Sequence, residues 1–156
     1  MRPPAEFKVM RMRECGPSPS EPVMGDCPAR IVKYWREQIA TASWFNQDQE
    51  SFVSIMLNTR CRITGHVLVA IGTLDQVIVH AREVFRAAIV NSASSIVIVH
   101  NHPSGDPTPS EADIRISREL QRSGQLLRIN VNDAVIIGDD KHVSLRELGF
   151  LNIIPR

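Results

Sequence analysis

The sequence has few cysteines, almost no net charge and no long apolar run. Its three cysteines, Cys15, Cys27 and Cys61, are widely spaced and form no Cys-x-x-Cys pair, so neither a disulfide framework nor a zinc ribbon is indicated. Three free thiols suit a reducing compartment best. With a net charge of +1, bulk charge provides no argument for a nucleic-acid partner or a membrane surface.

Signals for secretion or membrane insertion are also missing. The N-terminal residues lack the apolar core of a signal peptide, and no run approaches the ~20 apolar residues of a membrane span. We therefore expect a cytoplasmic protein with no membrane partner. The chain has 156 residues, the size of one ordinary domain, which buries roughly 70% of the surface of its unfolded chain.

A proline-rich segment separates the N-terminus from the rest of the chain. Residues 6–14 alternate weakly and predict one edge strand, whereas residues 16–22 predict a loop. We assign residues 1–27 to this edge strand and loop, and residues 28–156 to the main domain. A helix is predicted to begin at Pro28, with Asp26 as its cap. Trp35 in this helix is predicted to pack in the core, the alternative being a platform for a nucleic-acid base.

Strands and helices alternate along the main domain. Apolar patterns typical of strands occur at residues 52–57, 63–71, 77–79, 95–99, 126–131 and 134–137. The first two predict an antiparallel pair joined by a turn. Helices are predicted from about residue 81, from residue 110 to a C-cap at 123–124, and from 144 to 149 with Ser144 as cap. This order predicts an α/β fold, a three-layer α/β/α domain with a mixed sheet.

Two histidines at the end of the strand at 95–99 form the core of the candidate site. His100 and His102 are two residues apart, so in an extended chain their side chains point to the same side and can converge on one metal ion. Asp113 follows in the first turn of the next helix and completes an N/N/O ligand set. A hydrolytic zinc site needs three such ligands, an open position for water and a general base near it. The alternative is a proline- and glycine-containing loop with two surface histidines.

The general base is predicted to be Glu50, which immediately precedes the strand at 52–57. If that strand lies beside residues 95–99, its carboxylate reaches the open side of the metal and can pass a proton to a leaving amine. Glu83 and Glu111 are the rivals. Glu83 is more simply explained as a member of surface ion pairs, and Glu111 as a residue of an exposed helix start.

Two further polar residues in the histidine-containing turn have alternative interpretations. Ser110 is suited to cap the helix with Asp113 as its capping-box partner, and its hydroxyl can also stabilise the oxyanion of a tetrahedral intermediate. One hydroxyl can do both in part, because it donates and accepts. Asp106 is predicted to be a turn residue, with a fourth ligand as the alternative.

Taken together, the intervals between these residues resemble the JAMM (MPN+) metalloprotease motif at every position, namely Glu50, His100, His102, Pro103, Ser110 and Asp113. Within that superfamily, the string HNHPSGDPTPS is similar to the RadC-like branch of bacterial proteins. Gly72-Thr73, the REVFR string at 82–86 and the SLRELG string at 144–149 extend the resemblance. It covers roughly residues 28–150, so residues 28–156 are identified as a RadC-like JAMM/MPN metallohydrolase domain.

The resemblance implies a cytidine-deaminase-like α/β/α fold with one Zn²⁺ per chain, held by His100, His102 and Asp113. It further implies Glu50 as general acid/base, Ser110 as oxyanion stabiliser, and hydrolysis of peptide or isopeptide bonds in a peptide or protein substrate. Deaminase chemistry is not implied, because His-x-Glu followed by Pro-Cys-x-x-Cys does not occur in the chain.

The chain departs from the RadC-like pattern at two positions. Ala134 follows Asp133 where relatives usually carry histidine, so we expect metal binding to survive and substrate handling to differ. Ala81 replaces the usual proline before the Arg-Glu pair. We also expect no N-terminal helix-hairpin-helix region, the part of relatives most easily linked to DNA.

Two other functions compete with a zinc peptidase. One is a DNA-associated protein, either a metal-dependent nuclease or a repair accessory factor. Three arginines at helical spacing could face phosphates, although the glutamates among them favour a solvated helix face: Arg115, Arg118 and Arg122. The other is a non-catalytic scaffold with a vestigial metal site, which the five intact motif positions disfavour.

Overall fold

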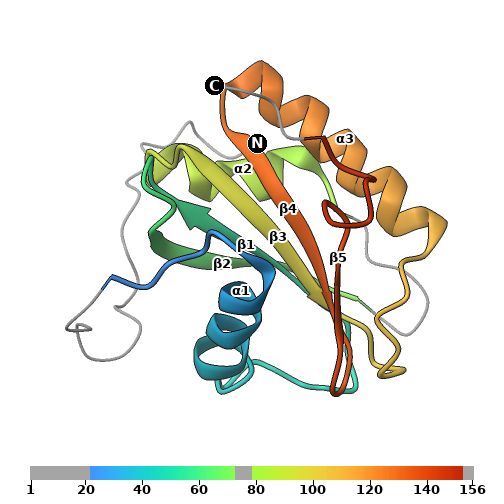
Figure 1. Ribbon diagram of the computed structural model, residues 1–156. Coiled ribbons are helices and arrows are strands. Elements are labelled where there is room, and N and C mark those ends of the chain that lie inside the picture. Colours follow the sequence, from blue (N-terminus) through green and yellow to red (C-terminus); the bar gives the residue numbers. More distant parts are fainter. Residues whose placement is uncertain (1–21, 73–78, 153–156) are drawn as a thin grey trace, which may run out of the picture.

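The computed structural model describes residues 22–72 and 79–152, which form a five-stranded sheet covered by helices on both faces (Figure 1). The strands stand in the order β2 (Ile63–Ile71), β1 (Ser51–Leu57), β3 (Ser95–Asn101), β4 (Asn130–Ile137) and β5 (His142–Ser144). Only β3 and β4 pair in parallel; the other neighbours are antiparallel. The predicted mixed sheet is confirmed.

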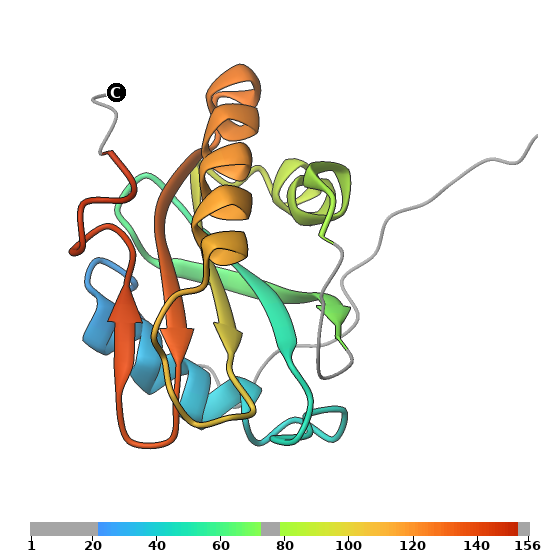
Figure 2. The ribbon, with the colours of Figure 1, turned by 90° about the vertical axis from the view of Figure 1, so that its right-hand side faces the viewer.

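Three layers are visible when the sheet is viewed from two directions (Figures 1 and 2). One face is covered by α1 (Pro28–Tyr34), which continues as the π-helical turn η1 (Trp35–Ile39). The other face is covered by α2 (Ala81–Val90) and α3 (Glu111–Leu127). Separate apolar clusters fill the two interfaces, so the α/β fold is stabilised from both sides of the sheet.

The central strands are buried because both of their faces are covered. Every residue of β1 and of β3 is buried, whereas the edge strand β2 is only partly buried. Continuous runs of branched apolar residues are typical of such doubly covered strands. Trp35 is buried in the α1 cluster, as predicted for a core residue. The site therefore rests on the most deeply buried strands of the sheet.

The boundary between α3 and β4 differs from the prediction. The helix continues past the expected end at 123–124 to Leu127, and Arg128 caps it in the left-handed conformation with φ 56°. Residues 126–127 are therefore helical, and the two strands predicted at 126–131 and 134–137 are one strand, β4. Gly124 therefore lies inside the helix. A side chain does not fit at this position, because a Cβ there would stand 2.4 Å from the carbonyl oxygen of Ile129.

Two predicted helix caps are also wrong. Cys27 rather than Asp26 is the N-cap of α1, and Asp26 instead forms an ion pair with Arg30 at 2.9 Å. At the C-terminus, Ser144 belongs to β5 and the residues after it form turns instead of a helix. Its hydroxyl still accepts a hydrogen bond from the Glu147 N–H at 3.1 Å, so the capping contact exists without the helix.

Some predictions concern residues beyond the described ranges. The edge strand at 6–14 lies outside the described residues, as does nearly all of the loop at 16–22. Of the strand predicted at 77–79, only Val79 is described, and it is not in a strand. Across residues 22–72 and 79–152, the helices are too short or too polar to cross a bilayer.

Candidate metal centre

His100 lies near the end of β3 and faces α3. In the antiparallel pairing of β1 with β3 it stands directly opposite Phe52, so the two side chains share one face of the sheet. Their rings stack with centroids 5.7 Å apart and planes inclined by 9°. This contact and the burial of the ring hold the imidazole in place at the base of the site.

His102 lies just beyond the strand and is oriented by two hydrogen bonds. Its backbone N–H donates to the carbonyl of Ile137 in β4 at 2.9 Å, and its Nδ1 lies 2.8 Å from the carbonyl oxygen of Asp106. A carbonyl only accepts, so Nδ1 carries the hydrogen, and in the neutral ring Nε2 keeps a free lone pair. The Nε2 atom is the one that faces His100.

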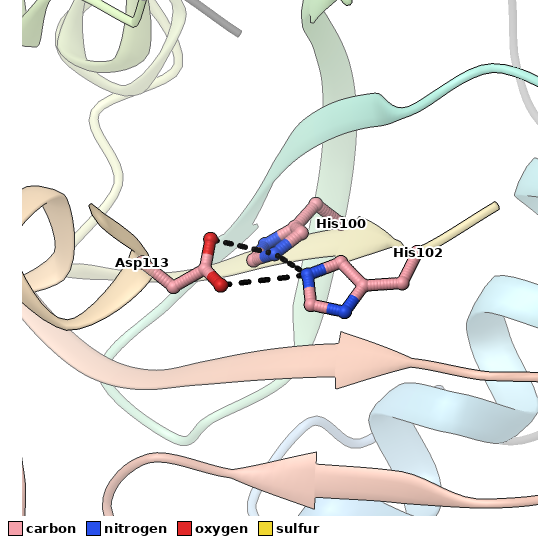
Figure 3. A group of neighbouring side chains, drawn as sticks. All are labelled: His100, His102 and Asp113. Atoms are coloured by element: carbon pink, nitrogen blue, oxygen red, sulfur yellow. Dashed lines mark hydrogen bonds and ion pairs between the residues drawn. The ribbon is translucent and has the colours of Figure 1, made fainter. Parts of the chain in front are cut away.

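Asp113 reaches the histidines from the first turn of α3. Its Oδ1 lies 3.2 Å from His100 Nε2 and its Oδ2 lies 3.4 Å from His102 Nε2, while the two Nε2 atoms are 3.2 Å apart (Figure 3). Two atoms bound to one tetrahedral zinc at ~2.0–2.1 Å are themselves about 3.3 Å apart. The three side chains thus form a group that could hold a metal ion, and its spacing fits zinc.

Glu50 lies at the edge of this group. Its Oε1 is 3.9 Å from His100 Nε2, and its side chain is 23% exposed compared with 5% for His100. The carboxylate is near the ligand atoms without being one of the three. The two rival glutamates lie elsewhere: Glu83 pairs with Arg82 and Arg86 on the surface of α2, and Glu111 is exposed.

The electrostatics of the group follow from its burial and close packing. Burial raises the pKa of Glu50, and the nearby Asp113 adds to this effect while His100 opposes it. When the His102 ring is protonated, its Nε2–H donates to Asp113, and this hydrogen bond raises the pKa of His102. Burial alone would raise the pKa of Asp113, but hydrogen bonds from both histidines and from Ser110 together lower it. The Asp113 carboxyl is therefore held in its anionic form, which would suit binding of a cation.

Ser110 forms the predicted capping box with Asp113. Its hydroxyl accepts from the Asp113 N–H at 3.1 Å and donates to Asp113 Oδ2 at 2.7 Å, and its own N–H donates to the same oxygen at 2.7 Å. Both functions of the hydroxyl are therefore used within the helix start. The Asp113 carboxylate is fixed by these bonds, which orient it towards the histidines.

The turn between His102 and α3 is supported by the loop that joins β4 to β5. Gly105 has φ +79°, and a Cβ there would stand 2.3 Å from Asp139 Oδ2. Gly138 faces it in turn, because a Cβ at Gly138 would stand 2.3 Å from the Gly105 carbonyl oxygen. Asp106 is a turn residue as predicted, and its Oδ1 accepts from the N–H and hydroxyl of Thr108. The interlocked glycines were not among the predicted site residues.

Two further positions bear on the site. Asn101, between the two histidines, received no role from the sequence, yet its side chain is buried and hydrogen-bonded to the segment that carries Glu50. An asparagine at the end of an apolar strand is the sequence signal that could have identified it. Ala134, one of the two departures noted in the sequence, is buried in the cluster between the sheet and α2 and α3.

The three arginines of α3 lie on an exposed helix face. Arg115, Arg118 and Arg122 are all exposed, as expected for a solvated helix face. Arg118 also contacts Phe150: its Nε–H donates to the carbonyl oxygen at 3.3 Å and its guanidinium lies 5.8 Å from the ring centroid.

The fold and the His-His-Asp group define an α/β domain with a candidate metal site at the end of its central strand. Residues 26–150 match the model of the RadC-like JAB domain. The chain belongs to this family.

Similar proteins from several organisms carry the name UPF0758 protein. The one from Geobacillus thermodenitrificans is 46% identical over 125 residues, which is 80% of this chain and 53% of that protein. The one from Bacillus licheniformis is 52% identical over 103 residues, 66% of this chain and 46% of the relative. The one from Methanosarcina mazei is 46% identical over 105 residues, 67% of this chain and 46% of the relative. The chain thus spans about half the length of the relatives it matches.

Proposed function

We propose that this chain is a zinc-dependent metallohydrolase that cleaves peptide or isopeptide bonds. The observation that carries the proposal is the position of Glu50 relative to the His-His-Asp group. Three potential ligand atoms lie at mutual distances suited to tetrahedral zinc, and a carboxylate outside the three stands 3.9 Å from His100 Nε2. This is the residue set that metal-assisted hydrolysis requires.

Each residue of the group has a distinct proposed role. His100 Nε2, His102 Nε2 and an oxygen of Asp113 would hold zinc, which supplies Lewis-acid polarisation and lowers the pKa of a water molecule. Glu50 would accept a proton from the attacking water and donate it to the leaving amine, as a partly buried carboxylate of raised pKa is suited to do. Ser110 would stabilise the oxyanion by turning its hydroxyl proton away from Asp113.

The substrate is proposed to be a peptide or protein, encountered in the cytoplasm. The two described cysteines, Cys27 and Cys61, are free thiols, as suits a reducing compartment. The exposed Glu111 and Glu119 lie on the same helix as the three arginines and offset part of their charge, so nuclease or repair activity has less support than peptide hydrolysis.

The substitution Glu50→Gln tests the proposal. We expect the zinc-loaded variant to keep one equivalent of metal and to lose hydrolysis of a peptide library by about 10²-fold or more, because only the proton-transfer group is changed. Zinc content by mass spectrometry and product formation are the measurements.

The matched control is Glu83→Gln, which removes a surface carboxylate and should leave both quantities unchanged. Retained hydrolysis in Glu50→Gln, with the reaction still dependent on zinc, would show that another group is the base. Zinc-dependent cleavage of DNA with no cleavage of peptides would favour the nuclease alternative.

A further inference from the structure

Asn101 lies between the two histidines in sequence, but its side chain points away from them. Side chains alternate along a strand, so Asn101 faces the α1 side of the sheet while His100 faces α3. Asn101 is only 5% exposed, and its amide contacts the segment that leads into β1. The middle residue of the His-Asn-His string therefore acts on something other than the metal ligands.

Its amide group holds both neighbours of Glu50. Asn101 Oδ1 accepts a hydrogen bond from the Ser51 N–H at 2.9 Å. Asn101 Nδ2 donates to the carbonyl oxygen of Gln49 at 2.9 Å and lies 3.5 Å from that of Gln47. One side chain thus fixes the backbone immediately before and immediately after the proposed general base.

These bonds begin where the backbone pairing of two strands stops. The register between β1 and β3 ends with Phe52 opposite His100, so the next residue of β1, Ser51, takes its acceptor from a side chain. On the other side, the Glu50 carbonyl accepts from the Gly72 N–H at 2.8 Å. Glu50 is therefore held between the end of β2 and the amide of Asn101.

Asparagine is suited to this position by its chemistry. The position of Asn101 at the end of the strand needs one acceptor for the Ser51 N–H and one donor for the Gln49 carbonyl, and a single amide group supplies both. Leucine has a similar size but would leave the N–H of the buried Ser51 without this acceptor and would lose the bond to the Gln49 carbonyl. Aspartate would keep the acceptor and place a second oxygen against the Gln49 carbonyl.

We propose that Asn101 is the positioning residue of Glu50: by holding Gln49 and Ser51, it sets the distance of the Glu50 carboxylate from the His-His-Asp group. This inference rests on the proposed function, because it assigns Glu50 a reaction to perform. The central strand then serves both parts of the site. His100 in the strand and His102 just beyond it would hold the metal, and Asn101 between them would place the general base.

The first test is Asn101→Ala, compared with Asn132→Ala as a matched control. Asn132, in β4, donates to Ser95 Oγ at 3.0 Å at the opposite end of β3, away from the site. With zinc saturating, we expect Asn101→Ala to lower kcat about 10- to 100-fold with KM within about threefold, because a displacement of ~1 Å has effects of this size. The control should keep kcat within about twofold. Unchanged kcat in Asn101→Ala would overturn the proposal.

A double-mutant comparison separates positioning from general loosening of the fold. If Asn101 acts through Glu50, adding Asn101→Ala to Glu50→Gln should leave the residual zinc-dependent rate within about twofold. A further 10-fold loss in that background would show that Asn101 acts on the metal ligands or on the fold, and would overturn the proposal.

A third measurement does not depend on activity. Amide hydrogen exchange of Ser51 should accelerate at least 10-fold in Asn101→Ala relative to exchange of the Val53 amide. Should this variant unfold at the assay temperature, Asn101→Asp keeps the Oδ1 acceptor and should preserve Ser51 protection while lowering kcat. Equal Ser51 protection in wild type and Asn101→Ala overturns the positioning role.

Together these experiments distinguish failure of the proposed function from failure of the positioning role. If wild type shows no zinc-dependent hydrolysis while Ser51 exchange still responds to Asn101→Ala, the proposed function fails and the positioning of this segment stands. If wild type hydrolyses peptides, Glu50→Gln does not, and Asn101→Ala behaves as wild type, the positioning role fails alone.

Discussion

Ser110 shows how one hydroxyl is shared between helix formation and the proposed chemistry. It accepts from the Asp113 N–H and donates to Asp113 Oδ2, so it both starts α3 and orients a candidate ligand. The proposed oxyanion role needs only the donated hydrogen, because the acceptor function can remain with the helix. Capping and catalysis can therefore be separated by experiment.

Replacing Ser110 by alanine should reduce stability and activity by different amounts. Loss of the cap is expected to lower the free energy of unfolding by about 1 kcal/mol. Loss of the oxyanion donor should lower kcat by about 10²–10³-fold at saturating zinc. Urea unfolding and steady-state kinetics are the measurements.

Threonine at position 110 is the matched control, because it keeps the hydroxyl and should keep most of both properties. If Ser110→Ala loses stability but retains kcat, Ser110 is a capping residue and the oxyanion role is wrong.

At the scale of residues, the His-His-Asp group was predictable from the sequence, whereas the contacts that hold the surrounding segments in place were not. His100, His102 and Asp113 lie within 14 residues of one another, joined by one strand end, one turn and one helix start, so local rules bring them together. Glu50 is far away in sequence and meets them only through the pairing of β1 with β3. Asn101 and the Gly105–Gly138 contact depend entirely on tertiary structure, which spacing does not encode.

The end of α3 shows how tertiary packing decides the boundaries of an element. Gly124 resembles a helix C-cap, yet the helix continues through it for three more residues. The reason is a close approach: the Ile129 N–H donates to the Gly124 carbonyl at 2.9 Å, and the chain folds back over the glycine. Local signals place a helix end at glycine, whereas here the glycine makes room for the turn that follows.

Gly124→Ala should therefore destabilise the protein although alanine is the better helix former. Alanine gains ~1 kcal/mol of helix propensity at an unconstrained position. Here its Cβ would meet the Ile129 carbonyl at 2.4 Å, and we expect a net loss of about 1–2 kcal/mol in the free energy of unfolding.

Chemical denaturation of the variant checks this value. Gln125→Ala, at the exposed neighbouring residue, is the control and should change stability by less than about 0.5 kcal/mol. A Gly124→Ala protein more stable than wild type would show that the turn after α3 can move aside.

At the scale of the whole molecule, the candidate metal site joins segments that the chain separates widely. It draws on the approach to β1, the end of β3, the start of α3 and, through Gly138, the loop after β4. A metal bound here would contact only the folded arrangement of these segments. Metal binding is therefore expected to contribute to the stability of the fold as well as to activity.

Removal of zinc should lower the unfolding temperature. A ligand at 100 times its Kd stabilises the folded state by about 2.7 kcal/mol, which corresponds to roughly 5–10 °C for a domain of this size. Calorimetry of the zinc-loaded protein before and after treatment with a chelator measures the difference.

His102→Ala is the control for this experiment, because it removes one proposed ligand. Its unfolding temperature should be the same with and without zinc. A chelator effect equal to that of wild type in this variant would place the stabilising metal elsewhere in the protein.

The layers of the fold were predictable from the sequence, but the order of the strands was not. Continuous apolar runs at 52–57 and 95–99 indicated doubly covered strands, and the amphipathic helices indicated the covering layers. The antiparallel pairing of β1 with β2 was predicted, because a turn joins them, and it is confirmed. The pairing of β1 with β3 joins residues up to about fifty positions apart. Local patterns do not encode such a pair, so the full sheet order came only from the structure.

The alternation of faces along β3 has a consequence for how the domain can vary. A shift of one residue in this strand would turn His100 and His102 towards α1 and Asn101 towards Asp113, exchanging the metal side of the sheet for the Glu50 side. Insertions and deletions in β3 must therefore come in pairs of residues if both halves of the site are to survive. The β2 and β5 edges carry no such parity constraint from this site, so variation in strand length is expected to collect there.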